Sequence, residues 1–194
     1  MGSPKQKELY SLQKYAQGCK FIIESGSGLS TKYLSEAKDP DGIMYSIDVY
    51  EQKVKYPGVV YKQGWSMVYE DLILPGHSLF KKSRYDSGPD VKIVFEGKKY
   101  MDGEVDWIRR ILNENTDKKL DFFFCDTGEY CGIAEWNIVK DIIPIGGYFA
   151  AHDIFYPKSV KNFRVFKKIK KSSQWKILVV NKSKQGLMVA EKIK

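Results

Sequence analysis

The chain of 194 residues has only three cysteines and two histidines. Cys19, Cys125 and Cys131 form no CxxC pair, and an odd number of scattered cysteines gives no basis for a disulfide framework. No cysteine or histidine cluster has the spacing of a zinc finger. We therefore expect a protein of a reducing compartment, and the cytoplasm is the expected location.

Long apolar runs are also missing. No stretch approaches the roughly 20 residues that a membrane-spanning helix needs, so we expect no membrane partner. The first fifteen residues, MGSPKQKELYSLQKY, contain no apolar signal core, so we expect no secretion signal. An apolar fraction of 43% is sufficient for a core, and this length predicts one domain over residues 1–194.

Several common functional motifs are absent. There is no GxxxxGK[ST] sequence, which argues against a Walker-type nucleotide site, and no GxSxG nucleophile motif. The dinucleotide fingerprint is incomplete, because counting from Gly26 and Gly28 the third glycine position holds Thr31. A nicotinamide cofactor is therefore poorly supported.

What the chain does have is the segment FIIESGSGLSTKYL at 21–34, in which an apolar run ends in an acid before a Gly-x-Gly turn. The pattern predicts a strand at 20–24 and a helix at 30–37. The glycines permit a tight turn and let a ligand lie against bare backbone. Asp48 ends the next expected strand, 43–48, 20 residues after Gly28. A carboxylate there can accept two hydrogen bonds from a ribose diol.

Strands and helices alternate along the rest of the chain. We expect a helix at 5–17, strands at 59–61 and 119–126, a helix at 129–142, a strand at 148–151, a helix at 159–169 and a hairpin at 175–190. This alternation predicts an α/β fold with a mainly parallel, Rossmann-like sheet, closed by an antiparallel hairpin.

The segment 64–118 is too long for an ordinary crossover connection. It contains PGHSLFKKSRYDSGPD, which is rich in turn-forming residues and includes His77, followed by an expected helix at 103–112. We interpret the segment as an insertion that forms a lid or a wall of an acceptor site. An exposed insertion is also a candidate surface for a homodimer.

Four features in this order resemble class I S-adenosylmethionine-dependent methyltransferases, in particular their small-molecule O-methyltransferase branch. They are E-x-G-x-G-x-S at 24–30, the acid at Asp48, DFFFCD at 121–126 and IPIGGYFAAHD at 143–153. The resemblance implies a seven-stranded, mostly parallel sheet with helices on both faces and a C-terminal antiparallel hairpin. It also implies S-adenosyl-L-methionine as cofactor and methyl transfer to a hydroxyl of a small molecule.

The resemblance also implies a role for each matching position. The implied cofactor-binding residues are Glu24, Gly26, Ser27, Gly28, Ser30, Asp48, Gly64, Trp65, Ser66 and Asp126. The turn at 26–28 would meet the methionine part, Asp48 the ribose and 64–66 the adenine, while Asp126 would lie beside the sulfonium. Glu24 would orient the turn or take up the cofactor's amino group through water. Glu24 and Asp48 could instead have capping roles, and Trp65 could be ordinary core.

Asp126, His152 and Asp153 are the candidate catalytic residues, because all three follow expected strands at one edge of the sheet. Some similar O-methyltransferases hold a divalent ion with an acid after the fourth strand and an Asp-Asp or Asp-Asn pair after the fifth. Histidine in the first position of that pair leaves Mg²⁺ in doubt and suits Mn²⁺, iron or zinc as well. The alternatives are that His152 is a neutral base, or that the group is structural.

The net charge of +8 is concentrated near the C-terminus, where residues 158–194 hold 12 Lys or Arg and one acid. Such asymmetry can mark an anionic acceptor or a nucleic acid, although a solvated lysine-rich surface explains it equally. An RNA methyltransferase is therefore one alternative function. The amino-methylation motif is absent after the fourth strand, where the sequence is CDTGEY. A cofactor-binding protein of this fold without methyl transfer is the other alternative.

Overall fold

The structure is a computed structural model that describes residues 4–72, 89–155 and 161–194. His77 and the rest of the PGHSLF sequence lie outside the described residues. None of the described helices is both long enough and apolar enough to span a bilayer.

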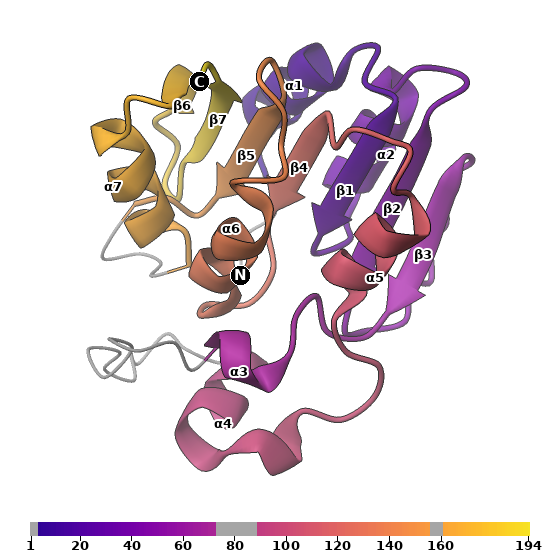
Figure 1. Ribbon diagram of the computed structural model, residues 1–194, viewed down its shortest axis with the longest axis vertical. Helices are drawn as coiled ribbons and strands as arrows, with labels where there is room; N and C mark the ends of the chain where they lie inside the picture. The colour runs from indigo at the N-terminus through magenta and orange to yellow at the C-terminus, as the bar shows by residue number, and fades with distance from the viewer. Residues whose placement is uncertain (1–3, 73–88, 156–160) are drawn as a thin grey trace.

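One seven-stranded sheet organises the chain, in the order β3-β2-β1-β4-β5-β7-β6 (Figure 1). The strands are β1 (Phe21–Ser25), β2 (Ile43–Asp48), β3 (Val59–Gln63), β4 (Phe122–Cys125), β5 (Tyr148–His152), β6 (Trp175–Asn181) and β7 (Leu187–Lys192). The first five pair in parallel, and β7 lies antiparallel between β5 and β6. The predicted mainly parallel sheet with a terminal antiparallel hairpin is confirmed.

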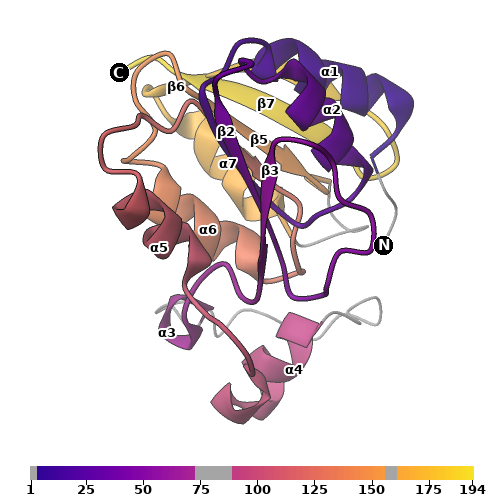
Figure 2. The same ribbon diagram turned by 90° about the vertical axis from the view of Figure 1, so that its right-hand side faces the viewer.

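Helices cover both faces of the sheet. They are α1 (Gln6–Ala16), α2 (Leu29–Ala37), α3 (Tyr69–Leu72), α4 (Pro89–Glu96), α5 (Trp107–Glu114), α6 (Cys131–Val139) and α7 (Phe163–Lys171), with a 3₁₀ turn, η2, at Lys98–Tyr100. Figure 2 shows α1 and α2 on one face and α5, α6 and α7 on the other. The helix expected at 129–142 begins at Cys131 and ends at Val139, and the one expected from 159 begins at Phe163.

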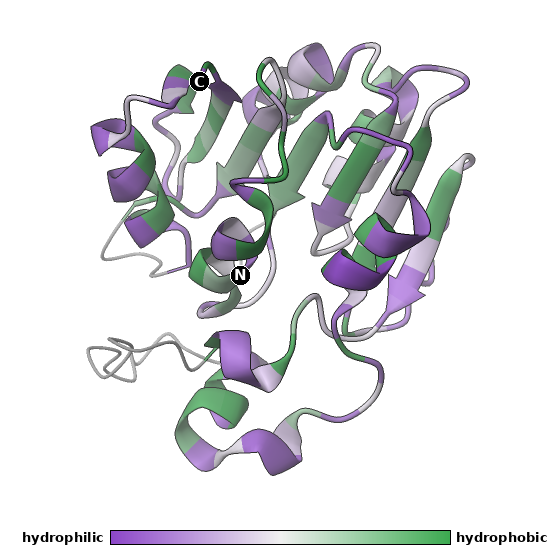
Figure 3. Cartoon of the chain, in the orientation of Figure 1, coloured by the Kyte–Doolittle hydropathy of each residue, from purple (hydrophilic) through white to green (hydrophobic). Residues whose placement is uncertain are grey.

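The central strands β1, β4 and β5 are apolar on both faces because both of their faces are covered (Figure 3). In β1, Phe21 and Ile23 belong to the core under α5, α6 and α7, whereas Ile22 belongs to the core under α1 and α2. In β4, Phe123 belongs to the core under α5, α6 and α7, and Phe122 belongs to the core under α1 and α2. The continuous apolar runs in the sequence therefore reflect strands buried from two sides.

Helices α3 and α4 lie beyond the carboxyl ends of the parallel strands (Figure 1). A third apolar cluster joins them to the main fold: Trp65, Met67, Leu72, Val91, Ile93, Tyr130, Cys131 and Ala134. The helix expected at 103–112 lies at 107–114, and the sequence analysis did not anticipate α4.

Asp121 joins the starts of β1 and β4. Its Oδ2 accepts the backbone N–H groups of Lys20, at 2.8 Å, and Phe21, at 3.0 Å. We expect Asp121→Ala to lower the free energy of unfolding in urea by about 1–3 kcal/mol, because two backbone donors lose their acceptor. Asp121→Asn keeps one acceptor oxygen and should lose less. An unchanged free energy of unfolding in Asp121→Ala would show that these two bonds do not stabilise the fold.

Candidate active site

A pocket of about 280 Å³ opens at the carboxyl ends of β1, β2 and β4. Most of the residues predicted to bind the cofactor line it: Gly26, Ser27, Gly28, Ser30, Asp48, Gly64, Trp65, Ser66 and Asp126. Glu24, His152 and Asp153 are not among the lining residues. The predicted residues thus separate into a pocket surface and a buried layer behind it.

Glu24 belongs to the buried layer and is fully inaccessible to solvent. Its carboxylate accepts hydrogen bonds from the hydroxyls of Ser30 and Thr31, both at 2.6 Å, and of Ser46 at 2.7 Å. Burial raises the pKa of Glu24 to about 7, although the three hydrogen bonds oppose the rise. Glu24 therefore fixes the start of α2 to β2, an arrangement that fits both the turn-orienting role and the capping role predicted for it.

The Gly-x-Gly turn passes very close to the end of β4. Gly26 has a φ of 91°, and a Cβ there would lie 2.3 Å from the backbone oxygen of Asp126. Only glycine fits both conditions. A Cβ on Gly28 would meet nothing within 4 Å, and its N–H donates to Thr31 Oγ1 at 2.9 Å. Gly26 serves the packing of the two strand ends, while Gly28 leaves bare backbone facing the pocket.

Asp48 ends β2 with both carboxylate oxygens held by backbone. Ser27 N–H donates to Oδ2 and Tyr50 N–H donates to Oδ1, each at 2.9 Å. Burial raises the pKa of Asp48, against the effect of these hydrogen bonds. The carboxylate is thus oriented at the pocket wall and keeps lone pairs for further donors.

Trp65 and Ser66 follow β3. The indole of Trp65 is buried in the third apolar cluster, and its N–H donates to the carbonyl of Asp102 at 3.0 Å. Trp65 is therefore a core residue that also lines the pocket, and its contact with adenine stays a prediction. The hydroxyl of Ser66 donates to Glu135 at 2.6 Å, and Glu135 itself is buried behind the pocket.

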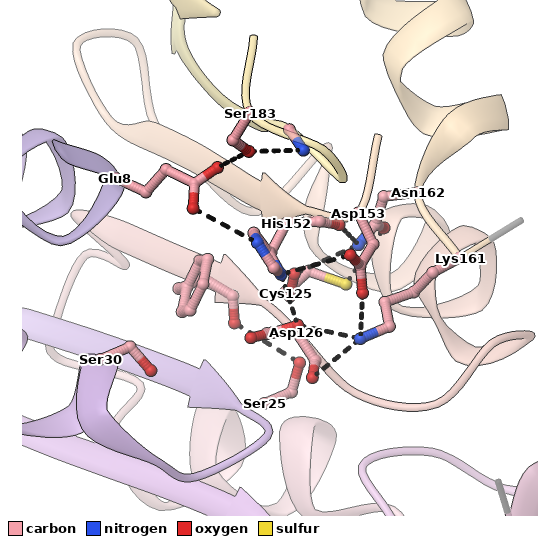
Figure 4. Close-up of polar contacts among 12 residues, drawn as sticks. Glu8, Ser25, Ser30, Cys125, Asp126, His152, Asp153, Lys161, Asn162 and Ser183 are labelled. Carbon is pink, nitrogen blue, oxygen red and sulfur yellow. Dashed lines mark hydrogen bonds and ion pairs between the residues drawn. The ribbon is translucent and has the colours of Figure 1, made fainter. Parts of the chain in front are cut away.

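The three candidate catalytic residues do meet, and a lysine lies among them (Figure 4). One ligand atom from each of Asp126, His152 and Asp153 lies within 4.8 Å of the others, a grouping that could hold a metal ion. The Nζ of Lys161 lies 2.9 Å from Asp126 Oδ1 and 2.9 Å from Asp153 Oδ2. Lys161 also lines the pocket.

His152 is buried between carboxylates from two directions. Its Nδ1 lies 3.3 Å from Asp126 Oδ1, and its Nε2 lies 3.6 Å from Oε2 of Glu8 in α1. Burial alone would lower the pKa of His152, but Asp126 and Glu8 outweigh it and raise the pKa to about 10. An imidazolium at neutral pH cannot accept a proton, so this environment does not favour the neutral-base role.

Asp90 is a pocket residue that the sequence analysis missed. It begins α4, is 1% exposed, and accepts the N–H of Tyr130 through Oδ2 at 2.6 Å. Within the described residues, its Oδ1 has no hydrogen-bond partner. The carboxyl lies so close to Gly128 that a Cβ there would be 2.4 Å from its Cγ. Burial raises the pKa of Asp90 to about 6.

Comparisons with known proteins bear on the fold. No protein-family model and no curated protein matches the chain. Solved structures do match. TomG, an O-methyltransferase from Streptomyces achromogenes involved in tomaymycin synthesis and crystallised with SAM, is 14% identical, with 99% of this chain and 82% of that chain covered at a TM-score of 0.57. An O-methyltransferase from Bacillus cereus in complex with SAH is also 14% identical, with 98% and 82% covered at 0.56.

A third structure is that of MycE, a methyltransferase from the mycinamycin biosynthetic pathway, in complex with Mg and SAH. It is 12% identical, and the match covers 95% of this chain and 48% of that chain at a TM-score of 0.57, so the chain spans about half the length of MycE. These likenesses show the fold, which is that of the class I methyltransferases, as the resemblance in the sequence implied.

The raised pKa of Asp90 predicts a pH-dependent effect on stability. The folded state holds this proton more tightly than the unfolded state, so the ionised carboxyl opposes folding increasingly as pH rises from about 4 to about 6. Asp90→Asn keeps an acceptor for Tyr130 and removes the titration. We expect the variant to gain on the order of 3 kcal/mol relative to wild type between pH 4 and pH 7, measured by urea unfolding. A difference that stays constant with pH would show that Asp90 ionises normally.

Proposed function

We propose that this protein is an S-adenosylmethionine-dependent methyltransferase that methylates a hydroxyl oxygen of a small molecule. The SAM and SAH held by TomG and the B. cereus enzyme support the choice of cofactor. The capture of MycE with mycinamycin VI, Mg and SAH supports a small-molecule acceptor. The proposal rests chiefly on the charge and position of the groups that line the pocket.

The charged side chains of the pocket favour a cationic ligand. Asp48, Asp90 and Asp126 supply three carboxylates, and Lys161 supplies one ammonium. The pocket is therefore negative at neutral pH. S-adenosylmethionine carries a sulfonium, an ammonium and one carboxylate, so its net charge is positive. NAD carries two negative phosphates and one positive nicotinamide ring, so its net charge is negative and the same field opposes it.

Each part of the cofactor finds suitable chemistry along the pocket. The methionine carboxylate suits the N-terminus of α2, because the backbone N–H groups of its first residues, Leu29 and Ser30, have no acceptor within the helix. The ribose hydroxyls would donate to Asp48, which its two backbone contacts already orient. The adenine would lie against Trp65. In this placement the sulfonium lies toward Asp126.

The reaction is an in-line displacement at the methyl carbon. A bond from the acceptor oxygen to carbon forms as the carbon–sulfur bond breaks, sulfur leaves as a neutral thioether, and the hydroxyl proton passes to a base or to solvent. The leaving group needs no acid, so the protein must mainly align oxygen, carbon and sulfur. Asp126 would attract the sulfonium, and Lys161 would stabilise negative charge that develops on the acceptor oxygen.

Described residues at both ends of the expected insertion line the two pockets in this proposal, among them Gly64, Pro89 and Glu104. A second pocket of about 470 Å³ adjoins the first and is lined by Val49, Tyr50, Gln63, Gly64, Trp65, Pro89, Asp102, Gly103 and Glu104. We assign the insertion as the acceptor-site wall of a single domain. The cytoplasmic location, the homodimer and the RNA substrate stay predictions.

The first test is calorimetric titration with S-adenosylmethionine and, separately, with NAD. We expect micromolar binding of S-adenosylmethionine and at least 100-fold weaker binding of NAD, because the two ligands differ in charge. Binding of NAD alone, or of neither ligand, would overturn the proposed cofactor.

The second test is Asp48→Ala, which removes the proposed ribose acceptor. We expect the affinity for S-adenosylmethionine to fall at least tenfold in the same calorimetric assay, a loss of about 1.4 kcal/mol. Asp41→Ala is a matched control. This aspartate is exposed and precedes the first residue of β2, whereas Asp48 is the last residue of the same strand. Unchanged affinity in Asp48→Ala would remove Asp48 from the ribose role.

A further inference from the structure

Lys161 lies where a divalent ion would need to be. The carboxylates of Asp126 and Asp153, with His152, form the only group of potential metal ligands found in residues 4–72, 89–155 and 161–194. The Lys161 ammonium bridges the two carboxylates, at 2.9 Å from each. Its side chain is 1% exposed, so the positive charge is enclosed among these groups.

A metal ion and this ammonium exclude each other. Carboxylate oxygens bind Mg²⁺ or Ca²⁺ at about 2.0–2.6 Å, so an ion shared by Asp126 and Asp153 would overlap the volume of the Lys161 Nζ. Moving the lysine away would break two buried ion pairs and leave its charge without partners. The second nitrogen of His152 faces Glu8, at 3.6 Å, which ties the ring to α1.

The backbone around Lys161 is fixed by its neighbour. The Asn162 side-chain amide donates to the carbonyls of His152, at 2.8 Å, and Cys125, at 3.2 Å. The N–H of Asn162 donates to the carbonyl of Asp153 at 3.2 Å. Asn162 thus joins the ends of β4 and β5 to the segment that carries Lys161. The ammonium therefore has a defined position at the pocket wall.

We propose that the Lys161 ammonium replaces the divalent cation in this chain, so that the protein acts without a metal. This inference rests on the proposed function for its catalytic part: Lys161 supplies, at the pocket wall beside Asp126, the positive charge that a metal would otherwise place near the acceptor oxygen. The structural part, a lysine in a cation site, does not depend on which reaction the protein performs.

The test is titration of the purified protein with Mn²⁺ alone, followed by electron paramagnetic resonance of the free ion. Wild type should bind no stoichiometric Mn²⁺. Lys161→Ala removes the charge and the volume together, so its Mn²⁺ affinity should rise at least tenfold above that of wild type. The double variant Lys161→Ala/Asp153→Asn is the matched control and should lose this gain, because one ligand is missing.

Two results would overturn the inference. One is stoichiometric Mn²⁺ binding by wild type that Asp153→Asn abolishes, since the lysine would then not exclude the ion. The other is folded Lys161→Ala, verified by circular dichroism, that gains no Mn²⁺ affinity. If Lys161→Ala does not fold, Lys161→Ser serves instead, because it also removes both the charge and the volume of the lysine and retains a small polar group.

The cofactor titration is done on the same samples, with and without 1 equivalent of Mn²⁺. Failure of S-adenosylmethionine to bind wild type overturns the proposed function. The Mn²⁺ titration then still tests, by itself, whether Lys161 occupies the place of a divalent ion. Cofactor binding by wild type that requires Mn²⁺ contradicts the replacement of the metal and leaves the proposed function intact.

Discussion

The ion pairs between Lys161 and the carboxylates of Asp126 and Asp153 are the interaction on which this end of the sheet depends. Asp126 in turn lies 3.3 Å from His152, whose other nitrogen lies 3.6 Å from Glu8. Positive and negative groups therefore alternate from α1 to the pocket wall. Removing one member of a buried series leaves its neighbours uncompensated, at a cost of about 3–5 kcal/mol. The packing of α1 and the charge of the pocket are consequently linked.

The fold and most of the residues that line the pocket could be predicted from the sequence because their signals are local. Short apolar runs, such as FII at 21–23 and FFFC at 122–125, are each followed by an acid, and they mark strands that are buried on both faces and the edge where these strands end. Asp48, Asp126 and His152 were predicted from that position alone. The carboxyl ends of parallel strands lie at one edge of the sheet in any strand order, so these residues were expected to lie close together at that edge.

The residues that the sequence analysis missed depend on long-range contacts. Lys161 looks like one more lysine in a basic segment, and only its pairing with groups 35 and 8 positions away along the chain distinguishes it. In the sequence, Glu8 looks like any polar residue of an amphipathic helix, and only its ion pair with His152 in the structure distinguishes it. Asp90 belongs to an insertion without a motif. The one local signal was Gly128, whose lack of a side chain makes room for Asp90.

The hydroxyl contacts of Glu24 have a consequence for binding thermodynamics. Ser30, Thr31 and Ser46 hold the Gly-x-Gly turn and the start of α2 against β2 before any ligand arrives. The entropy of ordering that loop is thus lost during folding and not during association. A ligand meets a rigid surface, so its affinity should carry little entropic penalty from the protein, and its association should be limited by entry to the pocket and not by loop closure.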